Sequence, residues 1–146
     1  MQRDVDELAD VLFGVDLGNL DTRAVTARLT REIVSWAAAR GWSTRTEARV
    51  HAADGAERAA RLGFIDVVVR RGLGQQDLAI EIDSCHKSWS LDKLRHAAGG
   101  GMHAVWIRWG DESWAGVHDD VDVLQLYENR SVGSRPTLID QLELRL

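Results

Sequence analysis

Hydrophobic and polar positions recur along the chain in patterns that predict helices first and strands afterwards. Over residues 22–40 apolar side chains recur at every third or fourth position, which predicts an amphipathic helix that ends at Gly41. Asp21 or Thr22 stands at the start of this run and is a suitable N-cap. Residues 4–13 show the same spacing over a shorter stretch and predict a short helix.

Three strands are predicted after the longer helix. Residues 42–52 alternate between apolar and polar side chains, as in a half-exposed strand. Residues 63–70 form a nearly continuous apolar run, which is typical of a buried strand. Residues 77–83 alternate again, with branched apolar side chains on one face and Glu81 and Asp83 on the other. The glycine-rich segment between the last two strands predicts a turn.

The rest of the pattern completes an α/β fold. A helix is predicted between Ser88 and the glycines at 99–101, and a buried strand at 102–109. Residues 121–128 fit either a strand or the start of a helix, and 138–146 fit a short closing helix. We therefore expect one domain with a central mixed sheet flanked by helices.

The composition is that of a single globular domain. Of the 146 residues, 45% are hydrophobic and 28% are charged. The longest apolar runs have about five residues, whereas a membrane span needs about 20. The acidic N-terminal segment lacks the pattern of a signal peptide, and Cys85 is the only cysteine. We expect a cytoplasmic protein that makes no contact with a membrane.

Charge is distributed unevenly around a net value of −5. Residues 1–21 carry one basic and six acidic side chains, residues 22–110 fourteen and nine, and residues 111–146 three and eight. A basic middle between acidic flanks suits a phosphate-binding core, although random scatter of surface charge would give the same counts. Arginine outnumbers lysine sixteen to two, and both lysines, Lys87 and Lys93, follow shortly after the acidic strand.

Acidic side chains in the two central strands are the strongest chemical feature. Asp66 interrupts an apolar run, where a carboxylate is costly unless it is paired, hydrogen-bonded or bound to a metal. Glu81 and Asp83 share one face of the next strand and repel each other unless a cation lies between them. A hairpin would bring the three together at one edge of the sheet. The sequence therefore predicts a metal site.

These residues, in this order of elements, resemble the PD-(D/E)XK nuclease superfamily, whose restriction-endonuclease-like core has the order α-β-β-β-α-β. Asp66 ends a segment that matches the first half of the motif, with Ile65 in the place of proline. The segment 81–83 matches the second half, with Asp83 in the place of lysine. The resemblance covers residues 22–109, and the acidic segment 111–146 follows as an extension.

The resemblance implies a nuclease that depends on Mg²⁺ or Mn²⁺ and cuts phosphodiester bonds in DNA rather than RNA. Asp66, Glu81 and the backbone carbonyl of Ile82 would bind the metal, because such cations prefer hard oxygen ligands. Glu32 on the first helix matches an additional acid found in many members and would act through water. The alternative for Glu32 is an ion pair with Arg28, one helical turn earlier.

Asp83, in the place of the motif lysine, leaves three interpretations open. Asp83 substitutes directly, as an additional metal ligand or a group that orients water. Alternatively, Lys87 or Lys93 supplies the missing ammonium group. In the third interpretation the domain is inactive and binds nucleic acid or a protein partner within a larger assembly, with the acidic extension as its docking surface. An unrelated α/β domain whose carboxylates pair with arginines such as Arg70 is a further alternative, and a homodimer is expected if both DNA strands are cut.

Two other features suit a nucleic-acid partner. Trp89, near the start of the second long helix, is a candidate base-stacking residue. Four strand arginines either meet phosphates or keep edge strands soluble. They are Arg45, Arg49, Arg70 and Arg71.

Overall fold

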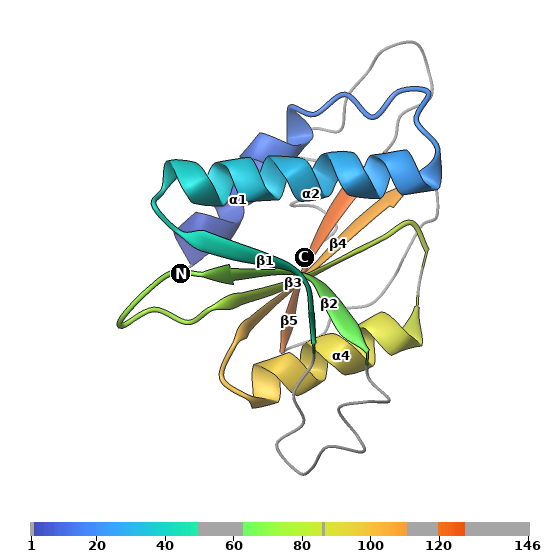
Figure 1. The fold of residues 1–146 in the computed structure, drawn as a ribbon. Helices are drawn as coiled ribbons and strands as arrows, with labels where there is room; N and C mark the ends of the chain where they lie inside the picture. Colours follow the sequence, from blue (N-terminus) through green and yellow to red (C-terminus); the bar gives the residue numbers. More distant parts are fainter. Residues whose placement is uncertain (1, 50–62, 86, 111–119, 128–146) are drawn as a thin grey trace.

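The computed structural model describes residues 2–49, 63–85, 87–110 and 120–127, which form a five-stranded sheet with helices on both faces (Figure 1). The helices are α1 (Gln2–Phe13), α2 (Thr22–Ala39) and α4 (Ser88–Gly99), and the strands are β1 (Ser43–Arg49), β2 (Phe64–Arg70), β3 (Leu78–Asp83), β4 (His103–Gly110) and β5 (Val121–Tyr127). The predicted α/β class is confirmed, as is the order helix, strand, strand, strand, helix, strand over residues 22–109.

The sheet is mixed and its strands lie side by side in chain order. β1, β2 and β3 are antiparallel neighbours, whereas β3, β4 and β5 are parallel. A parallel pair needs a crossover connection, and α4 supplies it between β3 and β4. In the parallel register Glu81 lies beside Trp106 and Asp83 beside Arg108.

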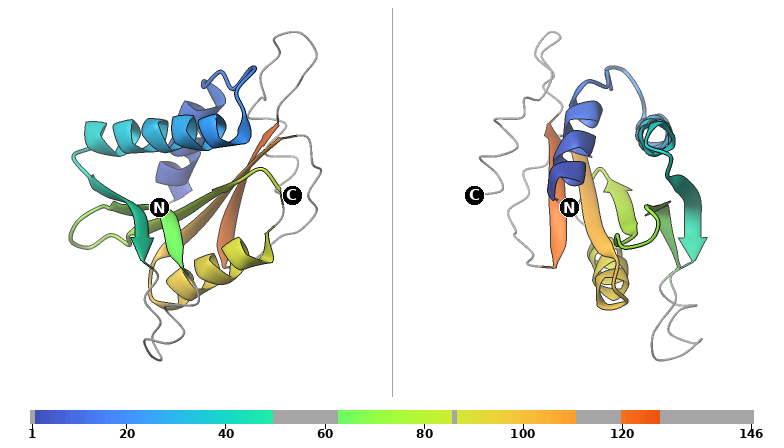
Figure 2. Two further views of the ribbon diagram at one scale, coloured as in Figure 1. Left: turned by 45° about the vertical axis from the view of Figure 1, so that its right-hand side comes forward. Right: turned by 90° about the vertical axis from the view of Figure 1, so that its left-hand side faces the viewer.

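Two hydrophobic clusters cover the two faces of the sheet. The first joins α1 and α2 to one face, and the second joins α4 to the other, as Figures 1 and 2 show. Leu78, Ile80 and Ile82 belong to the first cluster and Ala79 to the second, so β3 alternates as predicted. This alternation places Glu81 and Asp83 on the face that α4 covers.

Helix α2 begins and ends where its sequence predicts. The Asp21 side chain is the N-cap and accepts a hydrogen bond of 2.8 Å from the Ala24 amide. After the last turn Gly41 adopts a φ of 77°, which favours glycine, and its amide donates to the Ala38 carbonyl. The turn at Gly41 sets the direction in which the chain enters β1.

A cluster of buried charged side chains holds helix α1 against the rest of the fold. Asp4 accepts from Arg71 at 2.7 Å and from Arg40 at 3.0 Å. The Arg71 side chain is only 1% exposed, and its Nε also donates to the Gln76 carbonyl. The prediction that Arg71 meets phosphates or keeps an edge strand soluble is therefore wrong, because its guanidinium group lies inside the fold.

The C-terminal predictions are tested only in part. Of the two interpretations of residues 121–128, the strand is correct. The predicted helix at 138–146 and most of the acidic extension lie outside the described residues. Within the described ranges, no helix is long and apolar enough to span a membrane.

Candidate functional site

The side chains of β2 change from one face of the sheet to the other at Asp66. Ile65 packs in the α4-side cluster and Val67 in the α2-side cluster, although residues two apart in a regular strand share a face. On β1, Glu47 lies between the paired positions that flank Asp66 and has a φ of 50°, which is uncommon for a residue with a side chain. Local distortions of this kind re-aim side chains at sheet edges and next to functional sites.

Asp66 and Glu81 form a carboxyl pair across β2 and β3. Asp66 Oδ2 accepts a hydrogen bond of 2.8 Å from the Ile82 amide, which holds the Asp66 carboxyl beside β3. Glu81 is 2% exposed. Burial, then the hydrogen bond and negative charge of Asp66, raise the pKa of Glu81 to about 9, against the opposing effect of Lys93. At neutral pH Glu81 therefore holds its proton.

Lys93 on α4 places its ammonium group beside this pair. Its Nζ forms an ion pair with Glu81 Oε1 and donates a hydrogen bond of 2.8 Å to the Phe64 carbonyl. The Lys93 side chain is only 10% exposed, and a buried ammonium group is costly without such partners. The structure thus brings together Asp66, Glu81 and Lys93, one residue from each of β2, β3 and α4.

Asp83 points to different partners. Its Oδ2 accepts from Trp106 Nε1 at 2.8 Å, and its Oδ1 lies 3.3 Å from Lys87 Nζ. Among the described residues, no group of three or more histidine, cysteine or acidic side chains is arranged to hold a metal ion. Asp83 is therefore not brought to the carboxyl pair as a third ligand. Lys87 forms its ion pair with Asp83 and not with Glu81. The role of the Ile82 carbonyl as a ligand stays a prediction.

Glu32 lies on the flank of α2 that faces away from Asp66. It forms an ion pair of 3.2 Å with Arg28, the alternative that the sequence left open. With about 3.6 residues per turn, Arg28 and Glu32 lie on one side of the buried stripe around Leu29, and Thr30 lies on the other. Thr30 lines a groove that Asp66 also lines, and Glu32 does not.

This groove, of about 810 Å³, lies between α2 and the outer strand β1. Its lining residues are Thr22, Arg23, Thr26, Ala27, Thr30, Arg31, Val34, Thr46, Glu47 and Asp66. Neither Arg23 nor Arg31 forms an ion pair with any residue that the structure describes. Sequence reasoning missed this surface, although threonine at every fourth position (Thr22, Thr26, Thr30) marks one flank of the helix.

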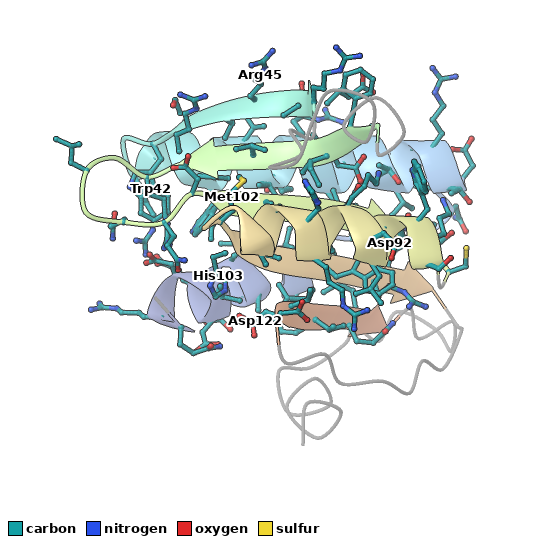
Figure 3. All side chains as sticks on the ribbon, turned by 90° about the horizontal axis from the view of Figure 1, so that it is seen from below. Trp42, Arg45, Asp92, Met102, His103 and Asp122 are labelled. Atoms are coloured by element: carbon teal, nitrogen blue, oxygen red, sulfur yellow. The ribbon has the colours of Figure 1, made fainter. Side chains whose placement is uncertain are left out.

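A second polar pair lies at the other end of β4. His103 Nε2 is 2.7 Å from Asp122 Oδ2, between the starts of β4 and β5 (Figure 3). His103 pairs in register with Leu78, whereas the carboxyl pair lies near the opposite end of β3. The His103–Asp122 pair is therefore not part of the site around Asp66.

A divalent cation at this site would be held by Asp66 and Glu81. Mg²⁺ is commonly held by one or two carboxylates, with water and substrate oxygens in its other positions. Asp66 and Glu81 supply two carboxyl groups on neighbouring strands, and their mutual repulsion is of the kind that a cation relieves. Binding would require Glu81 to lose its proton.

Comparison with known proteins assigns no family to this chain. No family model matches the sequence, and neither the curated proteins nor the solved structures gave a match. The chemistry of the site is therefore inferred from its own residues.

Proposed function

We propose that this protein is a divalent-metal-dependent nuclease that hydrolyses phosphodiester bonds in DNA on a restriction-endonuclease-like core. The observation that carries the proposal is the grouping of Asp66 and Glu81 on adjacent strands with Lys93 on Glu81. Two acids and one lysine are the groups that the PD-(D/E)XK motif combines. The element order over residues 22–109 supports the same reading.

Each side chain has a defined role in this proposal. Asp66 and Glu81 would hold Mg²⁺ or Mn²⁺, which when bound polarises the phosphate and lowers the pKa of a bound water. Lys93 stabilises the ionised form of Glu81 and presents an ammonium group to a water or a phosphate oxygen. Lys93 thus takes the part of the motif lysine, and Asp83 supports the site through Trp106 and Lys87.

Cleavage assays test the proposal. Purified protein is incubated with plasmid and with single-stranded DNA in Mn²⁺, beside Asp66→Asn and Glu81→Gln. Asparagine is preferred to alanine at position 66 because its side-chain oxygen still accepts from the Ile82 amide. Wild-type cleavage that both variants lose is the expected result. Cleavage by both variants at the wild-type rate would show that these carboxyl groups are not the catalytic site.

A second candidate function is a catalytically inactive domain that binds nucleic acid or a protein partner within a larger assembly. It is favoured by Lys93, which already supplies positive charge to the acid pair without a metal, and by Asp83 in the place of the motif lysine. Calorimetric titration separates the two candidates. Mn²⁺ binding that disappears in Glu81→Gln supports the nuclease, whereas no Mn²⁺ binding by the wild type supports the inactive domain.

A further inference from the structure

Two large aromatic side chains are exposed beside the carboxyl pair. Phe64 is 53% exposed and Trp89 is 48% exposed. Phe64 lies two residues before Asp66 on β2, and its carbonyl holds the Lys93 ammonium group. Trp89 lies about one helical turn before Lys93, and its indole nitrogen lies against Gly63, the residue before Phe64. Trp89 and the backbone of Phe64 therefore both lie close to the point where Lys93 meets the sheet.

Rings in this position suit unpaired nucleobases. Bases of a single strand stack on exposed aromatic side chains with little dependence on sequence. Bases inside a duplex are already stacked and paired, so a ring at the protein surface reaches them only when the strand is opened. Exposed aromatic residues next to a phosphodiester-cleaving site therefore favour a single-stranded ligand.

The groove along α2 complements the aromatic residues. Arg23 and Arg31 lie two turns apart, roughly 12 Å along the helix axis, with the hydroxyls of Thr26 and Thr30 between them. Guanidinium and hydroxyl groups are the usual contacts to phosphate oxygens. Among the described residues, the lining contains no aromatic and no amide side chain, so this part of the surface offers neither stacking nor amide readout of bases. The groove runs to Asp66 and connects the phosphate contacts with the acid pair.

We infer that the site takes a single-stranded nucleic acid, with backbone phosphates along the α2 groove and a base beside the reacting phosphate stacked on Trp89. The inference rests on the proposed function, from which it takes that the ligand is a nucleic acid. It adds that the nucleic acid is single-stranded, that it contacts two surfaces, and that binding depends little on base sequence. The phosphates would contact Arg23 and Arg31 in the groove, so binding of the polyanion does not depend on Mn²⁺.

Fluorescence anisotropy in EDTA measures this binding without cleavage. A labelled mixed-sequence oligonucleotide is used alone or annealed to its complement. We expect the single strand to bind at least about 10-fold more tightly than the duplex, and Trp89→Ala to weaken it by about 10-fold. Trp89→Phe keeps an aromatic ring and should retain most of the affinity. Arg23→Ala and Arg31→Ala should each weaken binding and lower the slope of log K against log salt by about 0.7.

Matched controls use exposed residues away from these surfaces. Arg70→Ala removes an exposed arginine from the far end of β2, and Leu73→Ala an exposed leucine from the β2–β3 turn. Both should bind the single strand as the wild type does. Equal affinity for single strand and duplex, or unchanged binding in Trp89→Ala and Arg23→Ala, would overturn the inference.

The binding assay tests the inference and the cleavage assay tests the nuclease, so either proposal can be refuted while the other stands. Single-strand binding that depends on Trp89, without Mn²⁺-dependent cleavage, would support the inference and refute the nuclease. Cleavage that depends on Asp66, with no preference for single strands, would refute the inference and support the nuclease.

Discussion

The ammonium group of Lys93 on α4 lies on the carboxyl group of Glu81 on β3, inside the layer between helix and sheet. Asp66 contacts the same carboxyl from β2. One buried acid therefore has a second acid and a cation as partners, and its pKa responds to both. Most of the testable consequences of the structure follow from this arrangement.

Glu81 makes the stability of the fold depend on pH. In the unfolded chain its pKa is near 4.5, and burial beside Asp66 raises it to about 9 in the folded protein. Between these values the folded state holds a proton that the unfolded state has lost. The contribution is therefore complete below pH 4.5 and falls as pH rises to about 9, by at most about 1.4 kcal/mol per pH unit.

Glu81→Gln tests this dependence, because a neutral amide resembles the protonated acid. Urea unfolding across that pH range should show the variant gaining stability relative to the wild type as pH rises. Parallel pH profiles for the two proteins would mean that Glu81 is ionised in the folded state.

Metal binding should compete with the proton on Glu81. Carboxylate ligands must be deprotonated to bind a cation, so the apparent affinity for Mn²⁺ should rise about tenfold per pH unit below the pKa of Glu81. Isothermal titration in buffers of different ionisation enthalpy also measures the proton released. An affinity that does not change with pH would place the metal on other groups.

The two lysines should differ in their effect on catalysis. Lys93 is buried on Glu81, whereas the Lys87 side chain is 55% exposed and pairs with Asp83. We expect Lys93→Met to lower kcat for plasmid cleavage by about 100-fold, the size of effect seen when a preorganised donor is removed. Lys87→Met should stay within about threefold of the wild type, since exposed ion pairs contribute little. The reverse order would assign the role of the motif lysine to Lys87.

Asp66 should prove structural as well as catalytic. In Asp66→Ala the Ile82 amide loses its acceptor, and a buried donor without a partner costs about 1–3 kcal/mol. Asp66→Asn keeps an acceptor and should remain within about 1 kcal/mol of the wild type in urea unfolding. Equal stability of the two variants would mean that the Ile82 amide finds another acceptor.

The buried cluster under α1 should dominate the stability of the N-terminal helix. Asp4→Ala leaves the Arg71 guanidinium group buried without its carboxylate partner, which we expect to cost about 3 kcal/mol. Glu7→Ala removes a partner of Arg40 whose side chain is 45% exposed, and should cost less than about 1 kcal/mol. Denaturant unfolding of the two variants, side by side, measures the difference.

Local patterns in the sequence were sufficient for the described elements as far as β4 and for the acid pair. The caps of α2 follow from Asp21 and Gly41, and the alternation of β3 follows from its period of two. Asp66 and Glu81 were found because a hairpin of adjacent strands aligns them. Each of these predictions depends on residues close together in the chain.

The remaining contacts depend on tertiary packing. The direction in which Asp83 points is set by Trp106, which reaches it through the parallel register of β3 and β4. Lys93 rather than Lys87 meets Glu81 because of how α4 lies across the sheet, which periodicity does not reveal. Arg71 pairs with Asp4, 67 positions earlier, and no local pattern predicts a partner so distant.

The distorted backbone at Glu47 also bears on self-association. β1 is the outermost strand beside β2, and a long flat outer strand invites another chain to add to the sheet. Here the left-handed residue Glu47 interrupts the pairing of β1 with β2, and the exposed Arg45 and Arg49 place positive charge on both sides of it, with Arg45 pointing outward in Figure 3. Two copies would bring like charges and a kinked backbone together along this edge. A homodimer that cuts both strands of DNA would therefore have to form through another surface.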